Sequence, residues 1–248
     1  MLKKAFAVTL LSTMLYLPLA NAEDILLDKN TPLVPQGWSV ADDDLKFKKD
    51  TQVVLNDQGE VMEGVLSSDT YLRPTGWKNM ILDYAYEYSS GIVFPYYGGL
   101  AFSSSIPMQT YGHIRYKSGE KIVFAADGTV LSGVISDAAT FSLQSGKYGF
   151  VTFKHDKRLN FDAAGHVLSG VLDENTYLRP LGYQNNKNNM SGFVEFKGNR
   201  AISFTADGFV REGELKEELL WKQPDGSTIT LPVKKVISFA ADGTATVK

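Results

Sequence analysis

The stretch FAADGTVLSGVI (124–135) is repeated almost unchanged as FDAAGHVLSGVL (161–172), beginning 37 residues later. Both copies fit the pattern F-x-x-x-G-x-V-x-x-G-x-L/I, in which an aromatic residue precedes a turn glycine and a second glycine follows it. Self-similarity of this kind is the sequence signature of a repeat architecture. The rest of the chain is therefore best understood as further copies of the same unit.

The pattern occurs four times in full and once in part across the 248 residues. Successive turn glycines are 69, 37, 43 and 35 residues apart, so the first interval contains either a degenerate unit or an insertion. A second similarity links DTYLRPTGW (69–77) with NTYLRPLGY (175–183). The predicted structural turn glycines are Gly59, Gly128, Gly165, Gly208 and Gly243.

Each unit predicts a β-hairpin. AADG, DAAG and TADG are turn sequences in which glycine can adopt positive φ, and the flanking segments KIVF and TVLSGV are rich in β-branched residues. The second glycine, inside the return strand, indicates a bulge or a close approach of neighbouring hairpins. Because one hairpin is marginally stable alone, the units must stack. The sequence predicts an all-β protein of repeated hairpins in an elongated array, solenoid-like or a single-layer sheet.

Residues 1–22, MLKKAFAVTLLSTMLYLPLANA, predict a secretory signal peptide. Lys3 and Lys4 precede a short apolar run, and Ala20 and Ala22 occupy the cleavage positions. A core helix or an uncleaved anchor is the alternative. No later run reaches the roughly 20 apolar residues of a membrane span, so no integral membrane segment is expected after signal removal. We expect an exported protein, periplasmic or at the cell surface.

The remaining chain divides into two parts. Residues 23–44, with two prolines and an acidic end, predict an irregular N-terminal lead-in that caps the first hairpin. Residues 45–248 predict the β-hairpin repeat domain, interrupted by an aromatic-rich insertion at about 77–112. Insertions in repeat arrays often gather on one functional face.

Composition limits the classes of function. The formal net charge is −3, and becomes −5 once the two lysines of the signal segment are removed. This mild acidity argues against nucleic acid as a partner. The chain has no cysteine, which excludes disulfides and thiolate metal sites. No cofactor is expected.

The insertion holds the candidate binding residues. Tyr84, Tyr86 and Tyr88 alternate, so on a strand all three would face one side. Aromatic side chains on rigid β surfaces commonly recognise sugars and proteins. The alternative is that these rings only cover the end of the array. The full candidate set is Trp77, Tyr84, Tyr86, Tyr88, Tyr96 and Tyr97.

Two other patterns have structural and functional interpretations. Arg73 and Arg179 each follow Tyr-Leu and precede proline. They either present a guanidinium to a carboxylate or phosphate or pack their stems on a neighbouring tyrosine, and the packing interpretation is preferred. Calcium binding is one interpretation of the turn aspartates and of the acidic run 42–44. However, calcium needs several spaced oxygen ligands, and turn geometry alone explains one aspartate per turn. No metal site is expected.

The hairpin core resembles two bacterial repeat families. One is the choline-binding type of cell-wall-binding repeat, whose aromatic-x-x-x-G-x-hydrophobic-x-x-G spacing matches Phe161, Gly165, Val167 and Gly170. The other is the MORN-like repeat in its bacterial variant. The resemblance implies a hairpin array, and the MORN-like variant also suggests a toxin or immunity-type partner. Choline is not implied, because its binding cages need recurring tryptophans and none of the three tryptophans lies at a repeated position.

Catalytic motifs are absent from the sequence: G-x-S-x-G, H-E-x-x-H, P-loop and G-x-G-x-x-G patterns do not occur. His155 and His166 fall on one hairpin and are expected to face solvent. The favoured function is a non-enzymatic binding or structural module of the cell envelope, with a protein or glycan partner. The alternative is a periplasmic hydrolase using Asp83, Glu87 or His113 of the insertion region.

Overall fold

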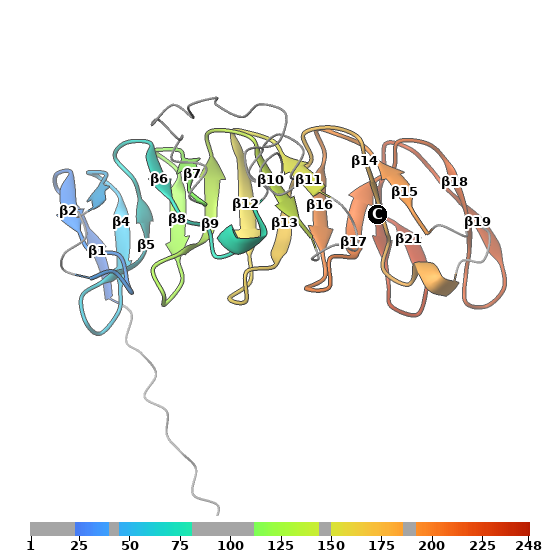
Figure 1. The fold of residues 1–248 in the computed structure, drawn as a ribbon, viewed down its shortest axis with the longest axis horizontal. Coiled ribbons are helices and arrows are strands. Elements are labelled where there is room, and N and C mark those ends of the chain that lie inside the picture. Colours follow the sequence, from blue (N-terminus) through green and yellow to red (C-terminus); the bar gives the residue numbers. More distant parts are fainter. Residues whose placement is uncertain (1–22, 40–44, 81–111, 144–149, 186–191) are drawn as a thin grey trace, which may run out of the picture.

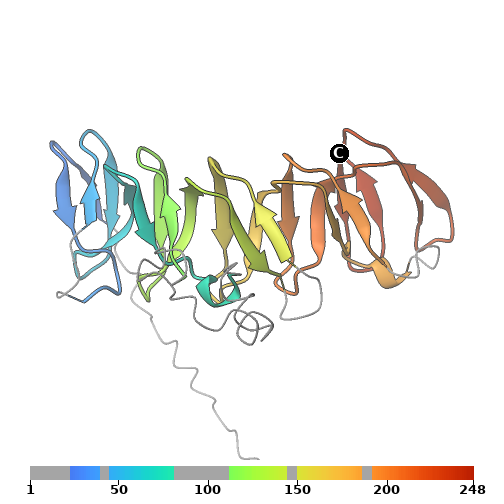
Figure 2. The ribbon, with the colours of Figure 1, turned by 45° about the horizontal axis from the view of Figure 1, so that its top comes forward.

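The structure, a computed structural model, describes residues 23–39, 45–80, 112–143, 150–185 and 192–248. These residues form an elongated all-β array in which the strands follow one another along the long axis (Figures 1 and 2). The predicted fold class is therefore confirmed. The predicted signal peptide, residues 1–22, lies outside the described residues.

One antiparallel sheet runs the length of the array (Figure 1). Its strands pair in the order β1-β4-β5-β8-β9-β12-β13-β16-β17-β20-β21. Two strands from each repeat unit, on either side of the turn glycine, enter this sheet. Their bounds are β1 Glu23–Leu26, β4 Gln52–Leu55, β5 Val61–Val65, β8 Lys121–Phe124, β9 Val130–Ile135, β12 Lys157–Phe161, β13 Val167–Val171, β16 Ala201–Phe204, β17 Val210–Glu214, β20 Val236–Phe239 and β21 Ala245–Val247.

The other strands pair as five two-stranded ribbons, each joining the end of one unit to the start of the next; four are separate from the main sheet, and the β6–β7 ribbon joins it through the pairing of β7 with β9. Isolated bridges such as Phe47 to Leu66 tie the ribbons to their own units. The array is therefore solenoid-like and has a second layer. The ribbons pair β2 (Thr31–Leu33) with β3 (Leu45–Phe47), β6 (Thr70–Leu72) with β7 (Ile114–Tyr116), β10 (Ala139–Ser142) with β11 (Phe150–Phe153), β14 (Thr176–Leu178) with β15 (Val194–Phe196), and β18 (Leu219–Lys222) with β19 (Thr228–Leu231).

We number the units 1 to 5 by their turn glycines, from Gly59 to Gly243. Unit 1 contains β3–β6, unit 2 β7–β10, unit 3 β11–β14, unit 4 β15–β18 and unit 5 β19–β21. Strands β1 and β2 form a half unit ahead of unit 1. Residues 23–44 were expected to be irregular, and this expectation was wrong for 23–33, because β1 pairs with β4 and β2 with β3.

The second glycine of the pattern makes room for an aromatic ring of the same unit. The preceding valine and this glycine are three residues apart, yet both are buried. Strand alternation has period two, so one extra residue must bulge out, and the register shifts immediately after Val61 and its counterparts in units 2 to 4. A methyl group on Gly64, Gly133, Gly170 or Gly213 would lie 2.5–2.7 Å from the ring of Phe47, Tyr116, Phe153 or Phe196.

All five predicted turn glycines have positive φ, as expected, from 76° at Gly59 to 92° at Gly243. A second recurring turn joins the first two strands of each unit. There a residue nine positions before the turn glycine also has positive φ. Aspartate and asparagine tolerate this conformation better than most residues. The five positions are Asp50, Gly119, Asp156, Asn199 and Lys234.

The long first interval is explained by an insertion between β6 and β7. Strand β5 pairs directly with β8, so no further hairpin of the sheet separates units 1 and 2. The additional residues fall in the connection that leaves β6 through η1 (Trp77–Asn79) and returns to β7. Residues 81–111 of this connection lie outside the described residues.

Three Pro-x-Gly segments (35–38, 74–77 and 180–183), here called bridging segments, each connect three successive units. Their prolines make parallel bridges to Val61, Val130 and Val210 of the next unit. Their glycines pack on the turn of the unit beyond. A methyl group on Gly182, for example, would lie 2.4 Å from the Ala240 carbonyl oxygen. The last segment precedes η3 (Tyr183–Asn185).

Tyr116 occupies the position that phenylalanine holds in units 1, 3 and 4, and its side chain is buried. Among the described residues, no atom forms a hydrogen bond with its hydroxyl group. Such a group costs about 1–3 kcal/mol. We expect Tyr116→Phe to raise the free energy of unfolding by about 1 kcal/mol, measured by urea denaturation. Destabilisation would show that the hydroxyl has a favourable partner.

The same substitution has an expected pH dependence. Burial raises the pKa of the Tyr116 phenol well above 10.0. Above about pH 10 the unfolded chain therefore loses this proton while the native protein keeps it, which favours unfolding. The advantage of Tyr116→Phe over the parent should widen as pH rises above about 10. A constant difference from pH 8 to 11 would contradict this.

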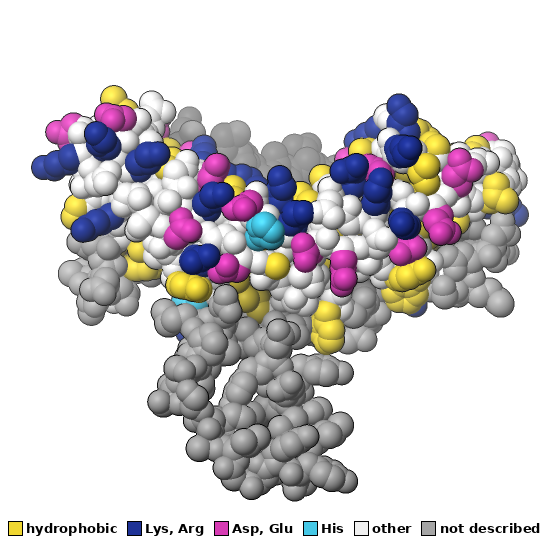
Figure 3. Space-filling model, turned by 90° about the horizontal axis from the view of Figure 1, so that it is seen from above, with side chains coloured by type: hydrophobic (Ala, Val, Ile, Leu, Met, Phe, Trp, Pro, Cys, Tyr) yellow, Lys and Arg dark blue, Asp and Glu magenta, His cyan; other side chains and the backbone are white. Residues whose placement is uncertain are grey.

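Positive and negative side chains are interspersed over the face shown in Figure 3. An ion pair joins unit 2 to unit 3 through Lys117 and Asp156, with 2.6 Å between Nζ and Oδ1.

Within the described ranges, no helix is long and apolar enough to cross a membrane.

Candidate functional site

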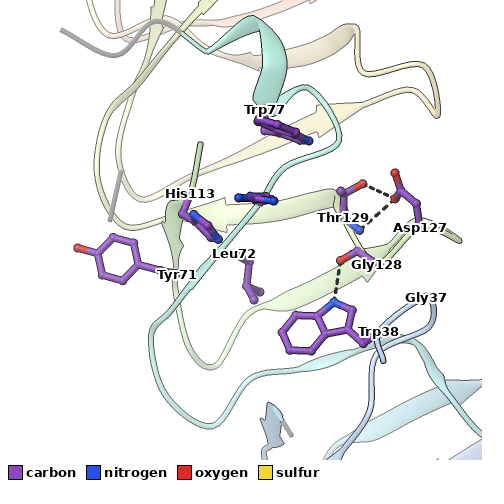
Figure 4. Close-up of a pocket in the computed structure, with 10 residues that line it drawn as sticks. Gly37, Trp38, Tyr71, Leu72, Trp77, His113, Asp127, Gly128 and Thr129 are labelled. Atoms are coloured by element: carbon purple, nitrogen blue, oxygen red, sulfur yellow. Dashed lines mark hydrogen bonds between the residues drawn. The ribbon is translucent and has the colours of Figure 1, made fainter. Parts of the chain in front are cut away.

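A cavity of about 460 Å³ opens between the first two bridging segments and the turn of unit 2 (Figure 4). Trp77 and Trp38 lie on opposite sides of it. Tyr71 and His113 lie at one end, and Asp127 and Thr129 at the other. The lining residues are Gly37, Trp38, Tyr71, Leu72, Arg73, Trp77, His113, Asp127, Gly128 and Thr129.

The first bridging segment fixes Trp38. The indole N–H of Trp38 donates to the Gly128 carbonyl oxygen at 3.0 Å, and the Gln36 side-chain amide donates to the Phe124 carbonyl oxygen at 2.6 Å. Gly37, at φ 76°, approaches this turn so closely that a methyl group would lie 2.4 Å from the Ala126 carbonyl oxygen. The Trp38 ring is thus held by backbone of unit 2 while remaining half-buried.

The second bridging segment places a cation against Trp77. The Arg73 guanidinium carbon lies 4.8 Å from the centre of the Trp77 ring, and the Lys78 Nζ atom lies 5.7 Å from it. Gly112 packs on the same ring, since a methyl group there would lie 2.8 Å from Trp77 Cε3. Arg179 stands similarly over Tyr183, at 5.1 Å. The preferred interpretation was that each arginine packs its stem on a neighbouring tyrosine; instead the guanidinium group lies over the ring, which is a tyrosine for Arg179 and Trp77 for Arg73.

The third wall is the turn of unit 2. Asp127 Oδ1 accepts hydrogen bonds from the Thr129 backbone N–H at 3.1 Å and from its hydroxyl at 2.6 Å. Asp242 of unit 5 accepts the Thr244 N–H in the same way, which holds the pKa of that carboxyl below 3.8. Both aspartates therefore stabilise the turns in which they lie, by accepting hydrogen bonds from the residue two positions later. Among the described residues, no three His, Asp or Glu side chains converge on a point where a metal ion could bind.

Units 4 and 5 fill the space that is open in unit 2. In unit 4, Phe209 stands at the position of Thr129 and packs on Tyr183, with 5.8 Å between ring centres. In unit 5, the buried Trp221 donates its indole N–H to the Gly243 carbonyl oxygen at 2.7 Å, the counterpart of the acceptor used by Trp38. The repeat therefore does not require an open cavity. In unit 2 the small Thr129 and Leu72 line an open cavity.

The structure describes only part of the predicted site. Trp77, and His113 from the hydrolase alternative, both line the cavity. Asp83, Glu87 and the five candidate tyrosines of the insertion lie outside the described residues. His155 is exposed, and His166 is partly exposed and contacts Asp162 at 2.8 Å.

Sequence reasoning missed Trp38, Arg73 as a cavity residue, and Thr129. A signal for Trp38 was present: NTPLVPQGW (30–38) aligns with NTYLRPLGY (175–183), so the lead-in carries a third copy of that motif. Trp38 and Trp77 hold the same position of it, so the expectation that no tryptophan lies at a repeated position was wrong. Nothing in the sequence indicated that Thr129 would face Trp38 and Trp77, because three different units supply these residues.

Comparison of the chain with protein-family models, with curated proteins and with solved structures gave no match. The resemblance to choline-binding and MORN-like repeats therefore stays a prediction. The chemistry of the cavity has to be inferred from its own residues. Aromatic faces beside an arginine, an aspartate, a histidine and a threonine suit a ligand with both apolar and hydrogen-bonding groups.

Proposed function

We propose that this chain is an exported, non-enzymatic repeat protein of the cell envelope that binds a glycan in the cavity between Trp38 and Trp77. Export rests on the predicted signal peptide. Binding rests on one observation: the cavity is open in unit 2, whereas Phe209 and Trp221 fill the corresponding space in units 4 and 5.

The size and lining of the cavity support a sugar ligand. Ligand sites commonly enclose about 300–1,000 Å³, and this cavity has about 460 Å³. A sugar ring has apolar C–H faces that can stack on an indole, and hydroxyl groups that need hydrogen-bond partners. The partners here are the Asp127 carboxylate, the Thr129 hydroxyl and the Tyr71 hydroxyl.

Filling the cavity should abolish binding. Thr129→Phe reproduces the residue found at this position in unit 4, so the fold should tolerate it. We expect at least about tenfold weaker binding to an immobilised panel of neutral and acidic glycans, because the ring occupies the ligand space. Thr129→Ser is the control: it keeps the hydroxyl bonded to Asp127 and leaves the cavity open.

Three outcomes would count against the proposal. If Thr129→Phe binds glycans as tightly as Thr129→Ser does, the binding site lies elsewhere on the protein. Capture of a protein but of no glycan would replace the glycan by a protein partner. Release of free sugar from the panel during the assay would favour the hydrolase alternative.

A further inference from the structure

Arginine immediately precedes the second and third bridging segments, and the guanidinium groups of these two residues, Arg73 and Arg179, lie in different surroundings. The Arg179 guanidinium carbon lies 5.1 Å from the ring centre of Tyr183 and 4.4 Å from that of Phe193. It thus contacts two aromatic rings. Arg73 lies over Trp77 at 4.8 Å, and His113 stands where unit 4 has Phe193. The same scaffold therefore surrounds one arginine with apolar rings and leaves the other beside a polar cavity.

Arg73 is exposed and lines the cavity. Arg115 pairs with Asp137 at 3.1 Å and Arg200 with Glu214 at 2.9 Å. Within the described part of the chain, by contrast, no carboxylate lies within ion-pair distance of Arg73. Stacking on Trp77 fixes the plane of the guanidinium group, which leaves its N–H donors available at the edge. A fixed guanidinium edge matches the geometry of a carboxylate, which accepts two parallel hydrogen bonds.

The charges around Trp77 favour an anion over a cation. Lys78 adds a second positive charge near the ring, 5.7 Å from its centre. A ligand ammonium group would have to compete with both cations for the Trp77 ring. The Asp127 carboxylate lies at the opposite end of the cavity from Tyr71 and His113 in Figure 4.

We propose that the cavity selects acidic sugars, with the carboxylate of the sugar bound by Arg73 and the ring lying in the cavity between Trp38 and Trp77. This inference rests on the proposed function and specifies its ligand class. Trp77 is then a positioning residue, because it holds the Arg73 guanidinium plane.

The test uses matched pairs of sugars and the protein purified after expression from its full sequence. The pairs are methyl glucuronide with methyl glucoside, and N-acetylmuramic acid with N-acetylglucosamine. Titration calorimetry should show about tenfold or stronger preference for the acidic member of at least one pair. Arg73→Gln should remove that preference, because the acidic member loses its carboxylate partner. Arg73→Lys, which keeps the charge but not the paired donors, should retain part of it.

Arg179→Gln is the matched control, since it removes the corresponding arginine of the other bridging segment, and it should bind like the parent. If neutral sugars bind as tightly as acidic ones, this inference is overturned, whereas the proposal of glycan binding still holds. If no sugar in the pairs or the panel binds, glycan binding fails and this inference fails with it. An acidic preference that survives Arg73→Gln would assign the carboxylate to another residue.

Discussion

Replacing Phe153 by alanine is expected to lower the free energy of unfolding by about 3–5 kcal/mol. The Phe153 ring is 1% exposed and packs edge-on against Phe204 of the next unit, with 6.2 Å between ring centres. Truncation removes buried apolar surface and leaves a cavity that the sheet cannot close, because the backbone on both sides is hydrogen-bonded in strands. Urea denaturation followed by circular dichroism measures the loss.

The reason for the strand glycine can be tested in the same background. A methyl group on Gly170 would lie 2.5 Å from Phe153 Cδ1, so Gly170→Ala alone should cost about 1–3 kcal/mol. With Phe153→Ala already in place, the clash with the ring is gone and only Leu159 Cδ1, at 3.0 Å, stays close, so Gly170→Ala should cost much less than in the parent. Equal costs in both backgrounds would show that the ring is not what excludes a side chain at position 170.

Gly208→Ala is expected to cost about 2–5 kcal/mol, the sum of two effects. Its φ of 78° disfavours any residue with a Cβ, and the new methyl group would lie 2.6 Å from the Leu143 carbonyl oxygen. Backbone at that position cannot rotate away as a side chain can. The loss should therefore exceed that of a turn glycine without such a neighbour.

Gly59 provides that matched control. It occupies the same position in unit 1 with φ 76°, but a methyl group there would meet nothing within 4 Å. Gly59→Ala should cost only the conformational strain, about 1–2 kcal/mol. The difference between the two variants measures how much the contact between non-adjacent units adds. If both variants lose the same stability, that contact does not limit the residue at the turn.

The sequence predicted the hairpin because the reasons for it are local. A turn glycine with positive φ, β-branched residues on both sides and a buried aromatic at fixed spacing act within about a dozen residues, so Phe124 and Gly128 can be interpreted without knowing their neighbours. The glycine inside the return strand was also informative, since the ring it accommodates belongs to the same unit.

The second layer could not be predicted in the same way. Its strands are only three or four residues long, as in LKF and IRY, and they pair between units. The strands within residues 23–33 were not predicted either, because β1 and β2 pair only with strands of unit 1.

The class of fold and the repeated unit can be predicted from the sequence, because the spacing of glycine, valine and aromatic residues encodes turn, bulge and core contact within each hairpin. The position of the candidate binding cavity, by contrast, depends on contacts between units that are visible in the folded structure. Trp38, Arg73 and Thr129 come from the half unit and from units 1 and 2, and they meet because each bridging segment crosses to the units that follow it. Whether the space between units is filled or open depends on the volume of the side chains at these contacts. Local sequence patterns carry no information about which side chains will contact each other between units.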